Sequence, residues 1–442
     1  MFDCPMEGAP SARVLLLGAN GLIGSAVAAR LMARGYEVIG VGRDIAAARI
    51  AMPGMEWLAR DLRRMTRPEQ WPPLLAGVTA VVNCAGALQD SPRDDLSAVH
   101  LGAPLALYEA CAALGLRRVI HVSAAGTSAH RDTAFSRTKF DMEEALARLD
   151  LDWLILRPGL VIAPGAYGGS ALLRALAAFP FVIPAVHASA RVQIVSLDDL
   201  AATILLALEP GAPARQTFDL LHHHNHGMAD ILRALRQWLG LSPAPTLNLP
   251  PWLAAGCGLC ADALAYAGWR SPMRSTSLAQ LHDGIEGDGA PWAAAFAIHP
   301  KSLQSILAEH PAGVQERWFA RLYLLKPLAL ATLVLFWAAS GLIGAAQVDG
   351  AAGILVAVGW PEGAARAAVL TGAALDLGLA FLVMRRSTAP MGLIGMAAAS
   401  IAYLLAGALA RPDLWLDPLG PYLKVAPGLA LTLLTLAIMD ER

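Results

Sequence analysis

The sequence predicts a doubly wound, parallel α/β sheet followed by an all-α membrane domain of four helices. Two observations lead to this fold class. In the first half of the chain, short apolar runs alternate with helical segments, as in a parallel sheet whose crossover connections are helices. Hydrophobic residues make up 56% of the 442 residues and charged residues only 16%, which is too little charge for a wholly soluble protein.

The charge and cysteine content narrow the class of function. The formal net charge is -1, and nucleic-acid binding requires a basic face, so we expect no nucleic-acid partner. Five cysteines in 442 residues are too few for a disulfide framework, which indicates a reducing compartment. Residues 1–12 lack a basic region followed by an apolar core, so we expect no signal peptide.

A nucleotide-binding pattern begins the first half of the chain. The apolar run Val14–Leu17 predicts a buried strand, and a glycine-rich turn at residues 18–24 leads into a helical segment from Ser25 to Arg34. Strand, glycine turn and helix in this order form the context of a dinucleotide-binding fingerprint. The turn lets the backbone approach the pyrophosphate, and the helix N-terminus offers free N–H groups to the anion.

The end of the next predicted strand, Glu37–Val41, bears on which dinucleotide binds. Arg43 follows it and would accommodate the 2′-phosphate of NADP, whereas the adjacent Asp44 would hold the ribose 2′-hydroxyl of NAD. The sequence therefore favours NADP(H) and leaves NAD(H) as the alternative. A loop pair that binds no ligand is the remaining interpretation.

Further strands continue the alternation, and ligands of such a sheet bind at the carboxyl ends of its strands. We expect them at Val78–Val82, Arg118–Val122, Trp153–Leu156 and Thr217–Leu221. The residues that follow the first three, Asn83–Gly86, Ser123 and Arg157–Gly159, are therefore candidates for the site.

The motifs at these strand ends resemble those of extended or atypical short-chain dehydrogenases/reductases, a Rossmann-fold group that includes nucleotide-sugar epimerases. The matching motifs are G-A-N-G-L-I-G at 18–24, R-D-L at 60–62, N-C-A-G at 83–86, H-V-S-A-A-G at 121–126, L-R-P-G at 156–159 and S-L-D-D-L at 196–200. The resemblance covers residues 12–240. It implies that Asp61 and Leu62 flank the adenine, that Ala85 and Gly86 pass beneath the cofactor, and that Ser123 faces the substrate.

The resemblance implies a full set of site residues. The expected cofactor-binding residues are Gly18, Asn20, Gly21, Leu22, Ile23, Gly24, Arg43, Asp61, Leu62, Ala85, Gly86, Lys139, Pro158 and Gly159. Ser123 and Lys139 are the expected catalytic residues, and no metal ligands are expected.

The sequence departs from this family at the catalytic pair. The family carries Tyr-x-x-x-Lys on one helix face, where the Lys holds the nicotinamide ribose and lowers the pKa of the Tyr. Here Phe135 precedes Lys139, and a phenyl ring cannot exchange a proton. Ser136, Ser123 and Tyr167 are the alternative proton donors. His100 also stands where the family often has Asn.

Residues 321–442 form the predicted membrane domain, and they resemble the DoxX-like family of small four-helix membrane proteins. The expected spans are Pro327–Ala346, Ala367–Met384, Ser387–Ala410 and Leu419–Met439, each about 20 residues long as a bilayer requires. The apolar stretch Gly350–Trp360 is too short to cross and is expected at the interface or as a re-entrant piece.

Basic residues at the ends of these spans predict the orientation. Arg317, Arg321 and Lys326 precede the first span, and Arg385 with Arg386 separates the second from the third. The positive-inside rule places all five in the cytoplasm. We therefore expect a multi-pass inner-membrane protein with its Rossmann domain and both termini in the cytoplasm.

Asp376 lies within the second span, and two interpretations of this acid stay open. An intramembrane carboxylate is a candidate for proton handling or for binding a polar ligand. The alternative is a carboxyl group that is hydrogen-bonded to a neighbouring helix.

Four other features are assigned no function at this point. The four histidines His222, His223, His224 and His226 are expected in a solvated loop and not at a metal site, because neighbours in sequence rarely converge on one metal ion. Cys257 and Cys260 match C-x-x-C inside an apolar helical pattern, and packing is the expected explanation. Residues 241–320 are expected to connect the two halves, and the uncharged stretch Ala175–Ala190 falls where the family builds its substrate pocket.

Two functions fit these expectations. The first is a membrane-anchored NAD(P)(H)-dependent oxidoreductase, or an epimerase-like enzyme, with a small hydrophobic or membrane-associated substrate. The second is a non-catalytic NADP(H)-binding module that senses redox state or helps to assemble a membrane protein partner. Phe135 favours the second, because the proton donor of the family is missing. In both cases the lipid bilayer is a partner, and a proton or small solute passing Asp376 is a third possibility.

Overall fold

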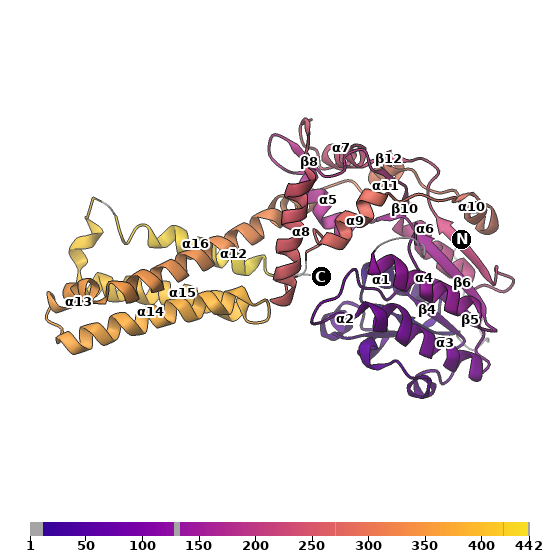
Figure 1. The fold of residues 1–442 in the computed structure, drawn as a ribbon, viewed down its shortest axis with the longest axis horizontal. Helices are drawn as coiled ribbons and strands as arrows, with labels where there is room; N and C mark the ends of the chain where they lie inside the picture. The colour runs from indigo at the N-terminus through magenta and orange to yellow at the C-terminus, as the bar shows by residue number, and fades with distance from the viewer. Residues whose placement is uncertain (1–11, 128–132, 270, 419, 441–442) are drawn as a thin grey trace, which may run out of the picture. The chain divides into compact units, whose positions relative to one another are not determined.

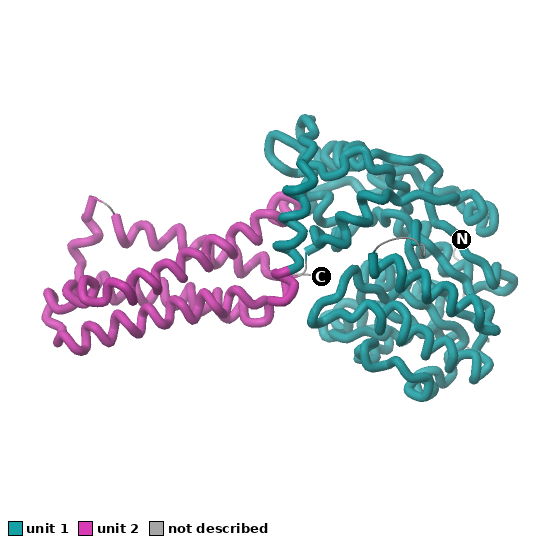
Figure 2. The backbone as a smooth tube through the Cα atoms, in the orientation of Figure 1, with its two compact units in different colours: residues 1–262, 271–317 teal, residues 263–270, 318–442 magenta. Residues whose placement is uncertain are grey.

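The computed structural model describes residues 12–127, 133–269, 271–418 and 420–440. The chain divides into two compact units (Figure 2). Unit 1 contains Met1–Asp262 and Ser271–Arg317, and unit 2 contains Ala263–Arg270 and Trp318–Arg442. Residues 271–317 thus belong to the same unit as the sheet.

Unit 1 is built on a seven-stranded sheet with the order β11-β6-β5-β4-β1-β2-β3. Figure 1 labels its strands β4, β5 and β6. Every neighbouring pair in it is parallel, which confirms the predicted doubly wound sheet. The strands are β1 (Arg13–Leu17), β2 (Glu37–Gly42), β3 (Glu56–Ala59), β4 (Ala80–Asn83), β5 (Arg118–Val122), β6 (Asp152–Pro158) and β11 (Gln216–Leu220). The strand order reverses between β1 and β4, and in such sheets ligands bind at this switch point.

The sheet is buried on both faces, which explains why its strands are continuous apolar runs. Val14 and Leu16 of β1 pack in one core with α1 (Leu22–Ala33), α6 (Leu197–Ala207) and α10 (Ala290–Phe296). Leu15 and Leu17 point to the other face, into a core with α3 (Ala103–Ala113) and α4 (Ala134–Ala147). The two helical layers fix the loops at the carboxyl edge of the sheet.

The rest of unit 1 consists of short helices and strand pairs around the sheet. The helices are α2 (Ala46–Ala51), α5 (Gly169–Ala177), α7 (Met228–Trp238), α8 (Pro251–Tyr266, which continues into unit 2), α9 (Ser275–Asp283) and α11 (Leu303–Glu309). The strand pairs are β7 (Leu160–Ile162) with β10 (Ile194–Ser196), β9 (Arg191–Val192) with β12 (His226–Gly227), and β8 (Ile183–Ala185) with β13 (Thr246–Asn248).

Two expectations about unit 1 are wrong. His222 and His226 are each only 7% exposed, so the histidine tract is not a solvated loop throughout; pairing of β12 with β9 draws His226 inward. Cys257 and Cys260 are both exposed, so packing does not explain them.

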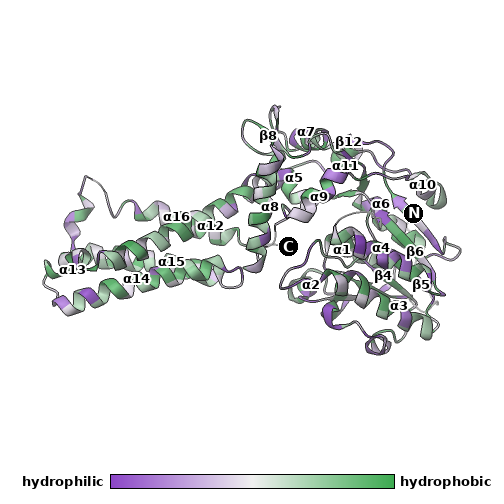
Figure 3. Ribbon diagram, in the orientation of Figure 1, coloured by the Kyte–Doolittle hydropathy of each residue, from purple (hydrophilic) through white to green (hydrophobic). Residues whose placement is uncertain are grey.

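Unit 2 is all helical, with α12 (Val314–Ala346, which starts in unit 1), α13 (Val348–Val356), α14 (Glu362–Met384), α15 (Ala389–Ala410) and α16 (Val425–Ala437). Its helices are largely hydrophobic (Figure 3). Among the described residues, α12, α14 and α15 are long and apolar enough to cross a membrane. The fourth helix is shorter than the predicted span, because no helix extends through Gly420 and Pro421. The 13-residue α16 begins only at Val425. Leu419 lies outside the described residues.

One end of this bundle is basic. The Lys326 ammonium on α12 and the Arg386 guanidinium, between α14 and α15, both donate to the carbonyl oxygen of Met439, at 3.2 and 3.0 Å. The part of α12 around Lys326, the α14–α15 connection and the residues just after α16 therefore lie together. Arg385 and Arg386 are thus at the same end as Lys326.

Asp376 is satisfied within the bundle. Ser340 of α12 donates to one carboxylate oxygen of Asp376 at 2.7 Å, and Tyr403 of α15 donates to the other at 2.9 Å. The ring of Trp337 stacks on Tyr403 with centroids 6.4 Å apart. Hydrogen bonds to neighbouring helices therefore account for Asp376. Through them this residue of α14 connects α14 to α12 and to α15.

Candidate cofactor site

The glycine turn after β1 is shaped by two close backbone approaches. Gly18 has φ +69°, and a Cβ added there would lie 2.8 Å from the Cα of Ala85. A Cβ at Gly24 would lie 2.2 Å from the carbonyl oxygen of Gly18. No larger residue fits either position, so the turn stays tight against the end of β4.

The helix behind this turn presents unoccupied N–H groups. Gly21 precedes α1 in an extended conformation and makes no side-chain cap, and Leu22 and Ile23 are the first residues of the helix. Asn20 instead donates to the carbonyl oxygen of Asp44 at 3.2 Å and so ties the turn to the end of β2. An uncapped helix N-terminus beside a glycine turn suits a pyrophosphate.

The two charged residues expected at the adenosine end are held by neighbouring side chains. The Arg43 guanidinium donates to Asp94 at 2.6 Å and also to the carbonyl oxygen of Arg93. Asp61 accepts hydrogen bonds from Arg63, which keep the pKa of Asp61 below its usual value. Leu62 follows in a single 3₁₀ turn, Leu62–Arg64.

Three of the expected cofactor-binding residues, Ala85, Gly86 and Lys139, lie together at the ends of β4 and β5. Asn83 accepts the N–H of Ala85 at 3.0 Å and fixes the turn that contains Gly86. A methyl group placed at Gly86 would lie 3.7 Å from Nε2 of His100 and 3.8 Å from Nζ of Lys139. The structure therefore brings Lys139 to the glycine that was expected beneath the cofactor.

Lys139 is buried, and its charge is poorly solvated. Its ammonium donates to the carbonyl oxygen of Val122 at 2.9 Å and lies 6.0 Å from the centroid of the Phe135 ring. Burial lowers the pKa of Lys139 to about 8, although the nearby Glu143 carboxylate opposes this shift. An ammonium with a pKa near neutrality is able to give up its proton.

His100 is neutral and has a defined tautomer. Its Nε2 accepts the backbone N–H of Ala87 at 3.0 Å, so its Nδ1 carries the hydrogen and donates to Thr138 Oγ1 at 2.9 Å. Burial, and then the charge of Lys139, lower the pKa of His100 to about 3. The His100 ring meets Phe135 edge-on at 5.5 Å. His100 thus supports the site and holds no transferable proton of its own at neutral pH.

Ser123 is committed to a buried network. Its hydroxyl donates to Glu143, which also accepts hydrogen bonds from Thr127 and from the Arg157 guanidinium. Glu143 is only 4% exposed, so the ion pair with Arg157 is needed to hold its charge in the interior. The oxygen of Ser123 is left to accept a hydrogen bond from a substrate, but its hydrogen is engaged.

The other alternative donors are less well placed. Ser136 accepts a hydrogen bond from Gln280 at 3.1 Å, and Tyr167 is 40% exposed on the loop before α5. Pro158 and Gly159 lie inside the fold, where a Cβ at Gly159 would meet Leu221 at 2.4 Å. Close packing is therefore sufficient to explain Gly159.

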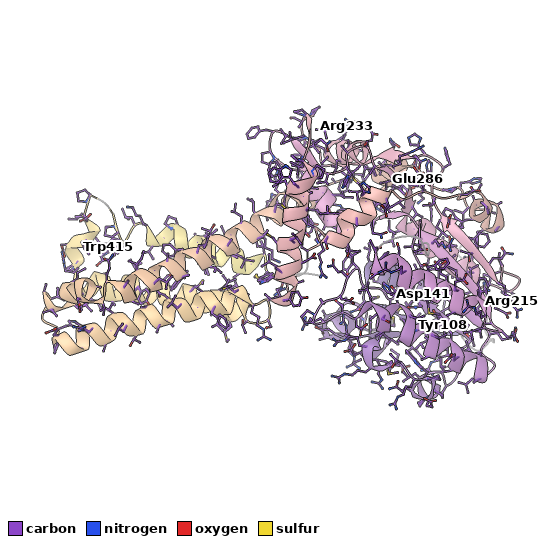
Figure 4. The ribbon with its side chains drawn as sticks, in the orientation of Figure 1. Tyr108, Asp141, Arg215, Arg233, Glu286 and Trp415 are labelled. Carbon is purple, nitrogen blue, oxygen red and sulfur yellow. The ribbon has the colours of Figure 1, made fainter. Side chains whose placement is uncertain are left out.

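Two features of the site have no signal in the sequence. Arg274 donates to the carbonyl oxygen of Asp90 at 2.9 Å, and Gln280 of α9 reaches the start of α4. Both lie in the segment expected only to connect the two halves. His121, the first residue of the H-V-S-A-A-G motif, is enclosed beneath the site, where the hydroxyl oxygen of Tyr108 of α3 (labelled in Figure 4) lies 2.9 Å from its Nδ1.

Comparisons with known proteins agree with this architecture. Residues 18–178 match the NAD(P)H-binding family, and residues 334–433 match the DoxX-like family. Sterol demethylase protein B of Methylococcus capsulatus is 25% identical over 330 residues, covering 69% of this chain and 98% of that protein. Photosystem II assembly factor Ycf39 of Trieres chinensis is 27% identical over 145 residues, covering 33% of this chain. The chain spans only 44% of the length of that Ycf39.

Solved structures share the fold of unit 1. The Bordetella bronchiseptica enzyme WbmG in complex with NAD superposes with a TM-score of 0.52 at 16% identity, covering 69% of this chain and 94% of WbmG. UDP-glucose 4-epimerase of Thermotoga maritima gives a TM-score of 0.51 at 17% identity, covering 71% of this chain and 99% of the epimerase. The chain therefore combines a Rossmann fold, in which residues 18–178 match the NAD(P)H-binding family, with a C-terminal region, residues 334–433, that matches the DoxX-like family.

Proposed function

We propose that this protein is a membrane-anchored NAD(P)(H)-dependent oxidoreductase that acts on a hydrophobic, membrane-associated substrate. The observation that carries the proposal is the meeting of Lys139 with Gly86 at the switch point of the sheet. The tight glycine turn and the uncapped α1 fit a dinucleotide there. When bound, the cofactor supplies or accepts the hydride.

Lys139 takes the place of the missing phenol as the proton donor. In the reduction of a carbonyl group, hydride adds to the carbon and the proton on Nζ of Lys139 passes to the oxygen. The neutral amine then regains a proton from solvent. The pKa of Lys139, about 8, leaves most of the lysine protonated at neutral pH and makes it a stronger acid than an exposed lysine.

Two features support a lipid-like substrate. The protein has helices able to cross a membrane, so its substrate need not leave the bilayer. It is also similar in sequence to a protein named sterol demethylase protein B, and the similarity covers nearly the whole length of that protein. We therefore propose a carbonyl or hydroxyl group on a sterol-like or isoprenoid lipid as the reacting group.

NADP(H) is the proposed cofactor, because Arg43 lies at the end of β2. The 2′-phosphate would replace Asp94 as the anionic partner of the Arg43 guanidinium. A charge-assisted hydrogen bond contributes about 1.5–3 kcal/mol. Arg43→Gln should therefore weaken NADPH binding by roughly tenfold to a hundredfold and leave NADH binding nearly unchanged, as measured by cofactor fluorescence.

The proposed location is the inner membrane, with the Rossmann domain and both termini in the cytoplasm. The basic end of the bundle, which contains Lys326 and Arg386, supports this orientation through the positive-inside rule. The terminal residues themselves lie outside the described residues.

A second candidate is a non-catalytic assembly or redox-sensing module. Phe135 in place of the usual tyrosine favours it, and so does the similarity to an assembly factor named Ycf39. This function would need cofactor binding but no turnover.

The decisive experiment follows NADPH oxidation by the solubilised protein in the presence of membrane lipid extract. We expect oxidation that falls as pH rises above about 8, because Lys139 must be protonated to act as the acid. Lys139→Met should abolish it, whereas Asp141→Asn, an exposed position on the same helix (Figure 4), should not. Tight binding without oxidation under any lipid condition would favour the assembly module.

A further inference from the structure

Helix α8 carries a wide apolar surface that no described part of the chain covers. Trp252 is 74% exposed, Leu259 67% and Tyr266 78%, and Cys257 and Cys260 are exposed between them. Between Pro251 and Tyr266 the sequence contains a single charged residue, Asp262. Such a surface is unfavourable in water, at about 25 cal/mol per Å² of apolar area.

The remaining narrow face of α8 is packed against α9. Ala254, Ala261 and Ala265 are buried, and a Cβ at Gly258 would lie 3.1 Å from the side chain of Leu278. Asp262 accepts hydrogen bonds from Arg274 and Ser275. The one charge of α8 is thus neutralised on the packed side, and the exposed face is uncharged throughout.

The C-terminal end of α8 is anchored at the basic end of the helical bundle. Residues 263–270 belong to unit 2. Within that unit, Trp269 donates its indole N–H to the carbonyl oxygen of Met384 at 2.8 Å, and the N–H of Arg386 donates to Ala267 at 3.0 Å. The Arg386 guanidinium lies 5.7 Å from the Trp269 ring. These contacts occur where α14 ends, and a spanning helix would leave the bilayer at such an end.

We propose that α8 lies in the bilayer–water interface, with its exposed apolar face in contact with lipid. Tryptophan and tyrosine favour this depth, because their rings are apolar and their N–H or O–H groups remain solvated. Such helices are buried about 5–10 Å into the boundary between headgroups and acyl chains. Arg385 and Arg386 at the anchored end suit anionic headgroups. Leu247, in the strand β13 that precedes α8 and pairs in parallel with β8, is also exposed, and so is Phe181, just before β8.

This placement would give the Rossmann unit a lipid contact besides the spanning helices. It depends on the helices α12, α14 and α15 crossing the membrane, but it does not depend on any redox chemistry. Its failure would therefore leave the proposed oxidoreductase activity untouched.

The test places a fluorophore on α8 and measures its depth. In the full chain with Cys4→Ser and Cys260→Ser, Cys257 is the reactive thiol. Cys111 is buried, and the pKa of the Cys84 thiol is raised to about 12, so neither reacts at neutral pH. An environment-sensitive label on Cys257 is compared, in nanodiscs of phosphatidylcholine and phosphatidylglycerol, with a label at Glu109→Cys, exposed on α3, in a variant that also carries Cys257→Ser.

We expect the Cys257 label to be blue-shifted, protected from aqueous iodide, and quenched more by lipids with a nitroxide near the headgroup than near the acyl-chain end. The Glu109→Cys label should behave as if in water. Equal iodide quenching of both labels would overturn the proposal. So would protection from iodide without quenching by either nitroxide lipid, because a protein surface or a second copy would then cover α8. Stronger quenching by the deep nitroxide would also overturn it, since α8 would then not lie at the interface.

Discussion

Replacing Lys139 by methionine should distinguish two effects of its ammonium group: the free-energy cost of burying the charge, and its contribution to cofactor binding. Lys139 is 6% exposed, and its ammonium donates one hydrogen bond, to the carbonyl oxygen of Val122. Methionine fills a similar volume and carries no charge. We expect the variant to bind NADPH roughly tenfold to a hundredfold more weakly, the loss of about 1.5–3 kcal/mol expected for a charged hydrogen bond to the ribose.

The structure predicts that this loss of function comes without a loss of stability. A pKa lowered from 10.5 to about 8 by burial corresponds to roughly 3 kcal/mol by which the native state disfavours the charged form. Methionine removes this penalty but leaves the Val122 carbonyl without its partner, at about 1–3 kcal/mol. The free energy of unfolding at neutral pH should therefore stay the same or rise by up to about 2 kcal/mol.

The pH dependence gives a second readout of the same claim. The native pKa of Lys139 is about 8 and the unfolded value near 10.5, so between these values the unfolded chain holds more protons than the native one. Stability must then rise with pH in this window, and Lys139→Met should lack that rise. Thermal unfolding of the solubilised protein at neutral pH and at about pH 9 measures both effects. A variant that unfolds several degrees earlier at neutral pH, or that binds NADPH normally, would refute the reasoning.

Three further outcomes follow from the same contacts. Phe135→Tyr should leave the rate of NADPH oxidation with carbonyl substrates nearly unchanged, because Lys139 already supplies the proton; a rise of about a hundredfold or more would show that the native site lacks its proton donor. Gly24→Ala should abolish cofactor binding in a fluorescence titration and destabilise unit 1 by about 1–3 kcal/mol, because its Cβ would lie 2.2 Å from the carbonyl oxygen of Gly18. Asp376→Leu should lower the unfolding temperature of the bundle, because it leaves the hydroxyls of Ser340 and Tyr403 without an acceptor, at about 1–2 kcal/mol for each hydroxyl. Asp376→Asn should largely retain the native unfolding temperature. Equal losses in the two variants would mean that the charge itself matters.

The strand ends were predictable because buried parallel strands leave a continuous apolar signal. Arg118–Val122 and the run at Val14–Leu17 were predicted within one residue of β5 and β1. Since the carboxyl ends of parallel strands share one edge of the sheet, the sequence also predicted that the candidate site residues lie along that edge. The strand order, and with it the switch point between β1 and β4, came from the structure.

The contacts that tune the site were not predictable, because they join residues far apart in sequence. Gln280 reaches Ser136 across 144 residues, and Arg43 meets Asp94 across 51. The proximity of Glu143 to Lys139 was available from their spacing of four on one helix face, but its ion pair with Arg157 was not. The length of α16 was missed because hydropathy continues through Gly420 and Pro421, where the helix does not.

The most direct measurement follows the hydride itself. The solubilised protein is incubated with membrane lipid extract and NADPH that carries deuterium at the reactive nicotinamide carbon, and the lipids are analysed by mass spectrometry. A membrane-anchored oxidoreductase predicts one neutral lipid that gains a single deuterium, and no gain with Lys139→Met. Deuterium that stays entirely in the cofactor, although the protein binds NADPH, would contradict the account and leave a binding module.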